Sequence, residues 1–187
     1  MDEFVFKKVS LITTPGLTRF MYSITFFGSL NFLLPAYLVI ILFDLYIKDK
    51  KLFLYIFFIG IGTTGLLFLL KFLFKRLRPS DPLLHAVNGF SFPSGHSFSG
   101  FTFFGILIYI IWNDTKLKRI NKWLTSILLF GIAATIAFSR IYLHVHFASD
   151  VIAGFCLSVI CLTSAYWLLK TITNRQLAEI KIPDPEL

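Results

Sequence analysis

Cysteine and acidic residues are scarce in this sequence, and both shortages narrow what the protein can be. Two cysteines occur among 187 residues, Cys156 and Cys161, five positions apart within one apolar run. On a helix this spacing places them on different faces, which argues against a disulfide and implies no metal site. Asp and Glu number 10 against 18 Lys and Arg, giving a net charge of +8. The basic residues form short clusters between apolar runs, not one patch, which argues against nucleic-acid binding.

Other kinds of segment are missing as well. The N-terminus lacks the basic start, apolar core and small-residue cleavage site of a signal peptide, so we expect the first apolar run to direct insertion. No repeat of solenoid length and no low-complexity tract is visible. Apolar residues, in contrast, are abundant: they make up 56% of the chain, Phe occurs 23 times and the mean hydropathy is +0.76. These values indicate a single membrane domain over residues 1–187.

Uncharged runs long enough to cross a bilayer, which takes about 20 residues, occur five times. All five should be helices, because isolated strands leave backbone groups unsatisfied in lipid. The first run is polar at its beginning, so its span should start near Asn31. The expected fold is all-α, a polytopic transmembrane helix bundle with spans at residues 20–43, 52–70, 97–113, 123–139 and 151–169.

The terminal segments and the charges between spans complete the expected layout. Residues 1–19 should form an amphipathic interfacial arm with Phe4, Phe6 and Leu11 toward lipid, and residues 174–187 a polar tail. Basic residues favour the C-terminal side as cytoplasmic, by ten against eight, so the N-terminus is expected outside. The ten are Lys48, Lys50, Lys51, Lys116, Lys118, Arg119, Lys122, Lys170, Arg175 and Lys181. The eight are Lys7, Lys8, Arg19, Lys71, Lys75, Arg76, Arg78 and Arg140.

Ionisable residues beside apolar runs are costly in membranes, so they mark candidate sites. The first group lies at the end of the second span, where Lys71 and Arg78 precede Pro79. These two cations are two helical turns apart and share a face if the helix continues that far. Lys75 and Arg76, between them, are interpreted as interface anchors.

The second group lies at the start of the third span, where Pro93, Ser94 and Gly95 precede His96. Small turn residues before a helix expose backbone N–H groups, and a helix N-terminus favours an anion. His96 beside such an anion is a candidate proton donor.

The third group is Ser139-Arg140, His146 and Asp150. Asp150 lies four residues beyond His146, so its carboxylate can reach the imidazole on one helix face or across a helix start. Such a carboxylate orients the ring and leaves the other nitrogen available as a nucleophile. Asp150 could also cap the fifth helix. His144, which has no matching carboxylate, is interpreted as an interface residue.

Two histidines, one carboxylate and three cations on one membrane face fit phosphoryl transfer. A metal site is disfavoured, because only one carboxylate accompanies the histidines. The three groups resemble the signature motifs of the type 2 phosphatidic acid phosphatase (PAP2) superfamily, complete and in order. The matching motifs are Lys71-x6-Arg78-Pro79, Pro93-Ser94-Gly95-His96 and Ser139-Arg140-x5-His146-x3-Asp150.

The resemblance implies roles for these residues. His146 would be the nucleophile, Asp150 its orienting partner and His96 the acid that protonates the leaving alkoxide. The phosphate would be bound, without a metal ion or other cofactor, by Lys71, Arg78, Arg140, the Ser94 side chain and the Gly95 backbone. Ser139 is interpreted as structural. Members of this superfamily commonly have six spans, whereas this sequence predicts five and lacks the first.

The implied substrate is a lipid phosphate, hydrolysed on the outer face of the cytoplasmic membrane. Undecaprenyl diphosphate, phosphatidylglycerophosphate, phosphatidic acid and a lipid A phosphate all remain candidates, and the oligomeric state stays open. Two other functions fit less well. A phosphotransferase would use the same motifs with a lipid or sugar acceptor in place of water. A lipid transporter on an inert phosphatase scaffold would not need the full set of ionisable residues.

Overall fold

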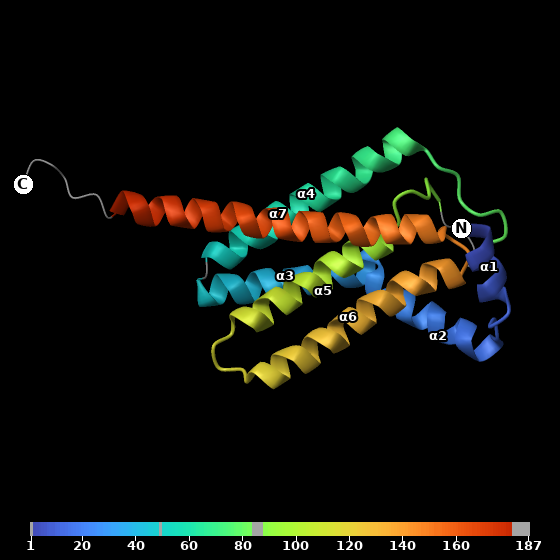
Figure 1. Ribbon diagram of the computed structural model, residues 1–187, viewed down its shortest axis with the longest axis horizontal. Helices are drawn as coiled ribbons and strands as arrows, with labels where there is room; N and C mark the ends of the chain where they lie inside the picture. Colours follow the sequence, from blue (N-terminus) through green and yellow to red (C-terminus); the bar gives the residue numbers. More distant parts are fainter. Residues whose placement is uncertain (1, 49, 84–87, 181–187) are drawn as a thin grey trace, which may run out of the picture.

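The computed structural model describes residues 2–48, 50–83 and 88–180 of the chain (Figure 1). Over these residues the regular structure is entirely helical, which confirms the predicted all-α class. The α-helices are α1 Asp2–Ser10, α2 Pro15–Thr25, α3 Leu30–Ile47, α4 Lys50–Phe74, α5 Gly95–Asn113, α6 Arg119–Tyr142 and α7 Ala148–Ile180, with a 3-10 turn, η1, at Phe26–Gly28.

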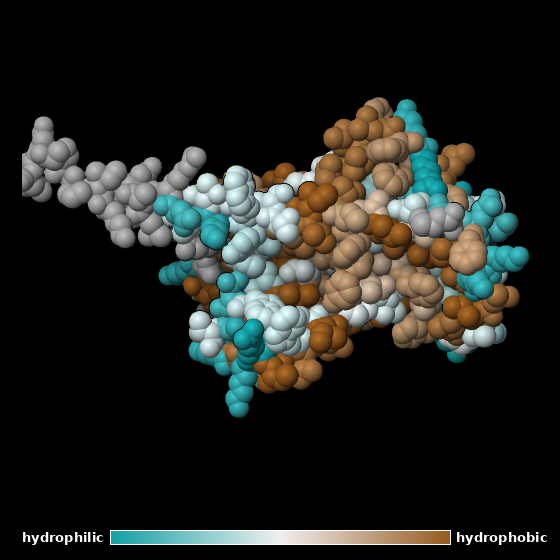
Figure 2. All heavy atoms as spheres, viewed as in Figure 1, coloured by the Kyte–Doolittle hydropathy of each residue, from teal (hydrophilic) through white to brown (hydrophobic). Residues whose placement is uncertain are grey.

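Among the described residues, five helices, α3 to α7, are long and apolar enough to cross a membrane, which confirms the predicted polytopic bundle. Large apolar side chains point outward from them: Leu42 on α3 is 56% exposed and Phe68 on α4 is 68% exposed. Apolar surface of this extent suits lipid, not water. Brown apolar side chains cover much of the middle of the molecule, while teal hydrophilic ones gather toward its two ends (Figure 2).

The first span begins at Leu30, which confirms the expected start near Asn31, but the preceding part of the apolar run forms a separate helix. The run at residues 20–43 is divided, because α2 ends at Thr25 and Ser29 is extended (φ −84°, ψ 157°) before α3 begins at Leu30. Helix α2 begins at Pro15, where the Thr14 side chain accepts a hydrogen bond from the Leu17 N–H at 3.3 Å. The interfacial arm therefore consists of α1 and the start of a second helix.

The orientation predicted for Phe6 is wrong. Phe4 and Leu11 are exposed, as a lipid-facing side requires, but Phe6 packs inward against the rings of His144 and Phe147. At the other terminus, α7 continues to Ile180, so the expected polar tail begins as helix. Residues 181–187 of that tail lie outside the described part of the chain.

Helix α5 is the centre of the bundle and packs against both α6 and α7. Gly154 allows the closest approach of α5 to α7, since a Cβ atom there would lie 3.0 Å from the Ser94 carbonyl oxygen and the Phe98 nitrogen. The beginnings of α5 and α7 meet the ends of α4 and α6 at one end of the molecule, where α1 also lies (Figure 1). The three groups of ionisable residues lie at this end.

Candidate functional site

A cavity of about 330 Å³ opens where α4 and α6 end and α5 begins. Six predicted site residues line it, although they come from three groups that are separated in the sequence. They are Lys71, Arg78, Gly95, His96, Arg140 and His146. The structure therefore brings together cations and both candidate histidines, as transfer of an anionic group requires.

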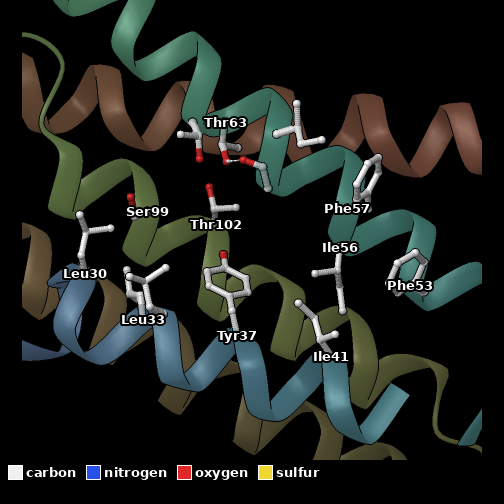
Figure 3. A pocket seen from close by; sticks show the side chains of 14 residues that line it. Leu30, Leu33, Tyr37, Ile41, Phe53, Ile56, Phe57, Thr63, Ser99 and Thr102 are labelled. Carbon is white, nitrogen blue, oxygen red and sulfur yellow. Dashed lines mark hydrogen bonds between the residues drawn. The ribbon is translucent and has the colours of Figure 1, made fainter. Parts of the chain in front are cut away.

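A second cavity of about 330 Å³ adjoins the first and is mainly apolar. It lies between α3, α4 and α5, and the hydroxyl groups of Tyr37, Thr63 and Thr102 point into it (Figure 3). Both cavities are lined by Leu30, Thr63, Thr64 and Ser99. The cationic site thus borders an apolar space that runs into the membrane part of the bundle.

Lys71 and Arg78 reach the cavity by different routes. Helix α4 ends at Phe74, and Lys75 adopts a left-handed conformation (φ 44°) that turns the chain, so the two cations do not share one helix face. Lys71 Nζ donates to the Phe90 carbonyl at 2.6 Å, and Arg78 Nη1 donates to the Val145 carbonyl at 2.8 Å. Backbone carbonyls therefore hold both side chains in place. Burial lowers the pKa of Arg78, an effect that the negative charge of Asp150 opposes.

Arg140 and His96 are held by contacts with Thr25 and Gly28, two residues that the sequence did not indicate as part of the site. Arg140, only 2% exposed, donates from Nη1 to the Thr25 hydroxyl of α2 at 2.6 Å. Its Nε is buried and has no hydrogen-bond partner in the described part of the chain. His96, on the first turn of α5, lies against Gly28 of η1, where a Cβ atom would come within 3.2 Å of His96 Cδ2. Glycine is therefore needed beside this imidazole.

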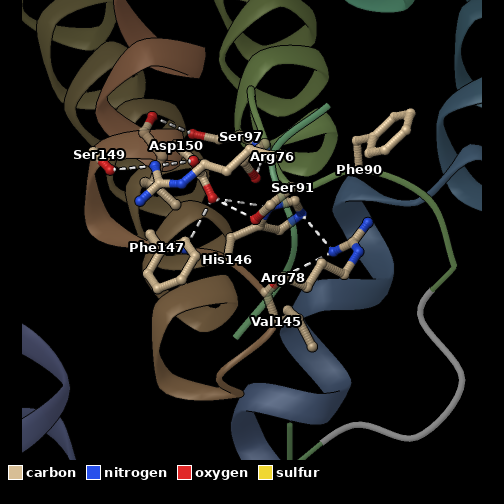
Figure 4. A network of polar contacts seen from close by, with 12 residues as sticks. Arg76, Arg78, Phe90, Ser91, Ser97, Val145, His146, Phe147, Ser149 and Asp150 are labelled. Atoms are coloured by element: carbon tan, nitrogen blue, oxygen red, sulfur yellow. Dashed lines mark hydrogen bonds and ion pairs between the residues drawn. The ribbon is translucent and has the colours of Figure 1, made fainter. Parts of the chain in front are cut away.

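The two ring nitrogens of His146 have opposite surroundings (Figure 4). Nε2 lies 3.2 Å from Arg78 Nη1, while Nδ1 lies 3.3 Å from Ser91 Oγ and 3.6 Å from Asp150 Oδ2. The last distance is too long for a hydrogen bond. Ser91 closes the gap, because its hydroxyl donates to Asp150 Oδ2 at 2.5 Å and its oxygen can accept the Nδ1 proton. Ser91 therefore bridges the carboxylate and the imidazole.

Asp150 caps the fifth helix, one of the two roles that the sequence left open, and its role as the orienting partner of His146 stays a prediction. Helix α7 begins at Ala148, so Asp150 lies in its first turn and Oδ2 accepts from the Phe147 N–H at 3.0 Å, as in a capping box. The second oxygen, Oδ1, accepts from Arg76 Nη1 at 2.6 Å. The interpretation of Arg76 as an interface anchor is therefore wrong: its side chain folds back onto the buried carboxylate.

The environment of His146 keeps its imidazole neutral. Burial lowers the pKa of His146 to about 4; its interaction with Asp150 opposes this shift, and the charges of Arg78, Arg140 and Lys71 add to it. A neutral ring with its proton on Nδ1, toward Ser91 and Asp150, carries its lone pair on Nε2, where Arg78 Nη1 lies 3.2 Å away. The nitrogen that faces the cationic cavity then carries the lone pair that a nucleophile requires.

The comparisons with known proteins agree with this geometry. A family model of the PAP2 superfamily matches residues 51–174. The chain belongs to the PAP2 superfamily. Phosphatidylglycerophosphatase B of Bacillus subtilis is 35% identical over 164 residues, 85% of this chain and 78% of that protein. Lipid A 4′-phosphatase of Bacteroides thetaiotaomicron is 31% identical over 125 residues, 61% of this chain and 52% of that protein.

A solved structure has the same arrangement of helices. The transmembrane PAP2-type phosphatidylglycerolphosphate phosphatase from Bacillus subtilis matches with a TM-score of 0.78 and 32% sequence identity, over 93% of this chain and 85% of that one. The family and the relatives together identify this chain as a PAP2-type membrane phosphatase, a phosphoric ester hydrolase that acts on lipids.

Not every residue of the PAP2 motifs lines the cavity. Ser94 is fully buried, and its Oγ accepts a hydrogen bond from the Ser97 N–H at 3.4 Å, so it caps α5. Its role as a phosphate ligand stays a prediction. Ser139 is buried and donates to the Ile136 carbonyl within α6. His144 packs on Phe6, with ring centroids 4.8 Å apart, and does not line the cavity.

The donors at the PAP2 site suit an anion better than a cation. Lys71, Arg78 and Arg140 would repel a metal ion, and the one nearby carboxylate, Asp150, already accepts from Ser91, Arg76 and a backbone N–H. Among the described residues, no group of three or more His, Cys, Asp or Glu side chains could hold a metal ion. Three cationic side chains at this site can neutralise charge on a bound anion.

Proposed function

We propose that this PAP2 phosphatase releases phosphate from a lipid phosphate through a phosphohistidine formed on His146. The observation that carries the proposal is the division of labour between the two ring nitrogens. Nδ1 faces Ser91 and Asp150, whereas Nε2 faces a cavity lined with cations. A nucleophile held by an orienting acid and aimed at an anion site is the arrangement that covalent catalysis uses.

In the first step, Lys71, Arg78 and Arg140 bind the non-bridging phosphate oxygens. His146 Nε2 attacks phosphorus and forms a P–N bond, while the bond between phosphorus and the lipid oxygen breaks. His96 gives its proton to the departing alkoxide, and the negative charge of the bound phosphate favours the protonated form of His96 beforehand.

In the second step, a water molecule replaces the lipid alcohol. His96, now neutral, accepts a proton from this water as its oxygen attacks phosphorus. The P–N bond breaks, inorganic phosphate leaves, and both histidines return to their starting states. The Asp150 carboxylate, acting through Ser91, stabilises the positive charge on His146 while the phosphoryl group is attached.

The substrate we propose first is phosphatidylglycerophosphate. The relative with the larger matched share, 78% of its length, is named a phosphatidylglycerophosphatase. The apolar cavity that borders the site gives a lipid tail a place beside the bound phosphate, which a soluble phosphate ester would not need. Phosphatidic acid, undecaprenyl diphosphate and lipid A phosphate are the competitors for the test below.

We further propose that the protein lies in the cytoplasmic membrane with this site facing outward. The opposite end of the bundle carries Lys48, Lys116 and Lys118 in its connections and Lys122 in the first turn of α6, as the cytoplasmic side of a membrane protein does. In a variant lacking native cysteines, a single cysteine at exposed Ser10 should react with a membrane-impermeant thiol reagent in intact cells. A cysteine at Leu117 should react only after lysis, and the reverse pattern would invert the orientation.

The function is tested by phosphate release from these four lipids by the detergent-purified full chain. His146→Ala is the decisive variant, and His144→Asn is its matched control. His144 is two residues away, packs on Phe6 and has a positive φ of 53°, which asparagine tolerates. Wild type and His144→Asn should release phosphate and become transiently labelled on His146 by radioactive substrate, and His146→Ala should do neither.

Each result has a separate meaning. Turnover by His146→Ala near the wild-type rate would remove His146 as the nucleophile. Label on His146 without phosphate release, together with a phosphorylated product when an acceptor lipid is added, would identify a phosphotransferase. The lipid with the highest kcat/KM identifies the substrate, and a preference for another lipid would overturn phosphatidylglycerophosphate.

A further inference from the structure

Arg76 connects the catalytic carboxylate to the N-terminal helix, although it belongs to none of the three PAP2 motifs. Its Nη1 donates to Asp150 Oδ1 at 2.6 Å and to Ser149 Oγ at 2.7 Å, and its Nη2 donates to Asp2 Oδ2 at 2.9 Å. The guanidinium also lies over the Phe147 ring, 4.1 Å from its centroid. Figure 4 shows Arg76 reaching across to Asp150 and Ser149 at the start of α7.

Asp2 completes the network from the side of α1. Its Oδ1 accepts from the Ser149 N–H at 3.0 Å, and its Oδ2 accepts from the Ser149 hydroxyl at 2.7 Å. Burial acts to raise the pKa of Asp2, but the hydrogen bonds from Ser149 and Arg76 outweigh it and hold the pKa below its usual value. Asp2 is therefore an anion at neutral pH, opposite a permanent cation.

Apolar contacts hold α1 in the position that this network needs. Val9 is 4% exposed in a core shared with α6 and α7, and Phe6 packs on Phe147 with ring centroids 5.6 Å apart. Asp2 is thus presented to Arg76 and Ser149 by a docked helix, not by a freely moving terminus. Asp2 of α1 and Ser149 at the start of α7 are therefore held together by hydrogen bonds.

The division of hydrogen bonds on Asp150 explains why Arg76 matters. Asp150 has no exposed surface, and a buried carboxylate is costly unless its charge is compensated. Oδ2 is occupied by Ser91 and the Phe147 N–H, so Arg76 supplies the cation at Oδ1. A carboxylate held at Oδ1 cannot rotate, which fixes Oδ2 on the side of Ser91 and His146.

We propose that Arg76 and Asp2 are positioning residues of this active site. Arg76 orients the Asp150 carboxylate and balances its charge, and Asp2 holds Arg76 in place, so the docking of α1 sets the rate of phosphoryl transfer. The inference rests on the proposed roles of His146 and Asp150. Neither Arg76 nor Asp2 lines the phosphate cavity, so both act through Asp150 and not on the substrate.

Arg76 and Asp2 carry opposite charges, so their removal should change the pH dependence of kcat in different ways. Without the Arg76 cation, the Asp150 charge acts more strongly on His146, which then takes up a proton more easily. The decrease of kcat on the acid side of the pH profile, its acid limb, should therefore occur at higher pH in Arg76→Gln than in wild type. Without the Asp2 anion, the Arg76 charge acts more fully on Asp150, so Asp2→Asn should not move the limb upward. The other charged or titratable groups facing this centre are Lys71, Arg78, His96 and Arg140.

The test compares two pairs of variants of the full chain in the phosphate-release assay, using the preferred lipid at saturation. Lys75→Gln controls for Arg76→Gln, because Lys75 is an exposed neighbour and its loss changes the charge equally. Glu3→Gln controls for Asp2→Asn in the same way. Arg76→Lys is included because it keeps the charge but offers one donor group, and it serves if Arg76→Gln does not fold.

Arg76→Gln should lower kcat by about 10- to 100-fold, by analogy with the residues that orient metal ligands in metalloenzymes, with KM within about twofold of wild type. Asp2→Asn should lower kcat less, and should add little in the Arg76→Gln background because it acts through Arg76. Arg76→Lys should fall between Arg76→Gln and wild type. Both controls should behave as wild type.

Two results would overturn the inference. One is a kcat for Arg76→Gln equal to that of Lys75→Gln. The other is a loss of activity with an unmoved acid limb, because a merely structural defect lowers the active fraction without changing the profile. His146→Ala in the same assay separates the hypotheses: if it stays active, the proposed function fails. If it is inactive while Arg76→Gln and Arg76→Lys match wild type, only this inference fails.

Discussion

Replacing Ser91 with alanine tests whether Asp150 reaches the nucleophile through a hydroxyl bridge. The Ser91 hydroxyl lies 2.5 Å from Asp150 Oδ2 and 3.3 Å from His146 Nδ1, and the residue is fully buried. The carboxylate oxygen and Nδ1 are 3.6 Å apart. A methyl group neither donates nor accepts, so the Nδ1 proton of Ser91→Ala would face a carboxylate beyond hydrogen-bond distance.

The size of the effect follows from the kind of hydrogen bond that is lost. A hydrogen bond to a charged group contributes about 1.5–3 kcal/mol. If that energy is lost from the transition state, where the imidazole gains positive charge, kcat falls by about 10- to 150-fold. KM should change little, because Ser91 does not line the phosphate cavity. Asp150→Asn should cost more, on the order of 10⁴-fold by analogy with the orienting aspartate of serine proteases.

Initial rates at saturating lipid phosphate in detergent measure this effect directly. Ser158→Ala is the matched control, because Ser158 is another buried serine, 1% exposed, whose hydroxyl donates within α7 to the Phe155 carbonyl. Thermal unfolding of both variants shows whether they fold. A Ser91→Ala enzyme that turns over within about twofold of the control would refute the bridge, and Asp150 would then orient His146 without it.

Four further predictions follow from the same geometry. Because burial lowers the pKa of His146 from 6.5 to about 4, kcat should hold down to about pH 5 and fall near pH 4; stability should decline as pH falls from 6.5 to 4, since the unfolded chain takes up the proton first. Gly28→Ala should reduce kcat, because the added Cβ would lie 2.6 Å from Ile136 Cγ2 and 3.2 Å from His96 Cδ2, and activity equal to wild type would contradict this close packing. Thr25→Val removes the hydroxyl 2.6 Å from Arg140 and should raise KM for the lipid phosphate, measured at constant detergent. Turnover should survive dialysis against a strong chelator, and recovery on adding a divalent ion after loss would contradict a site neutralised by side chains.

The sequence predicted the number of spans because hydropathy is a sum over many residues. A run of about 20 apolar residues has few alternatives to a membrane helix, whatever its neighbours are. The polar beginning of the run at residues 20–43 indicated a span that starts near Asn31, but two separate helices were not predicted, because the run contains no charge that would mark a boundary. The chain turns there at Gly28 and the extended Ser29, and only the packing of η1 against His96 and Ile136 explains why.

The motifs predicted most of the charged residues that line the cavity, but not Ser91 and Arg76, which contact the Asp150 carboxylate behind it. Lys71, His96 and His146 stand out because ionisable residues beside apolar runs need a reason to be there. Ser91 gave no such signal, since a serine in a loop is common. Arg76 was misread because it adjoins Lys75 and looks like the same anchor. The left-handed turn at Lys75 separates them, leaving Lys75 exposed and directing Arg76 to Asp150.

The N-terminal segment does more than attach the chain to the membrane. Arg140 is 2% exposed on α6, and a guanidinium at that depth needs a partner and a cover that lipid cannot supply. Helix α2 packs along α6 and supplies both, with Thr25 as the partner, while Thr18 bonds the Tyr142 hydroxyl at 2.9 Å. Helix α1 adds Asp2 on the other side of the site. The first two helices therefore cover the cations that the three motifs provide, and under the positioning role proposed for Arg76 and Asp2 the residues that set catalysis extend beyond the motifs to α1.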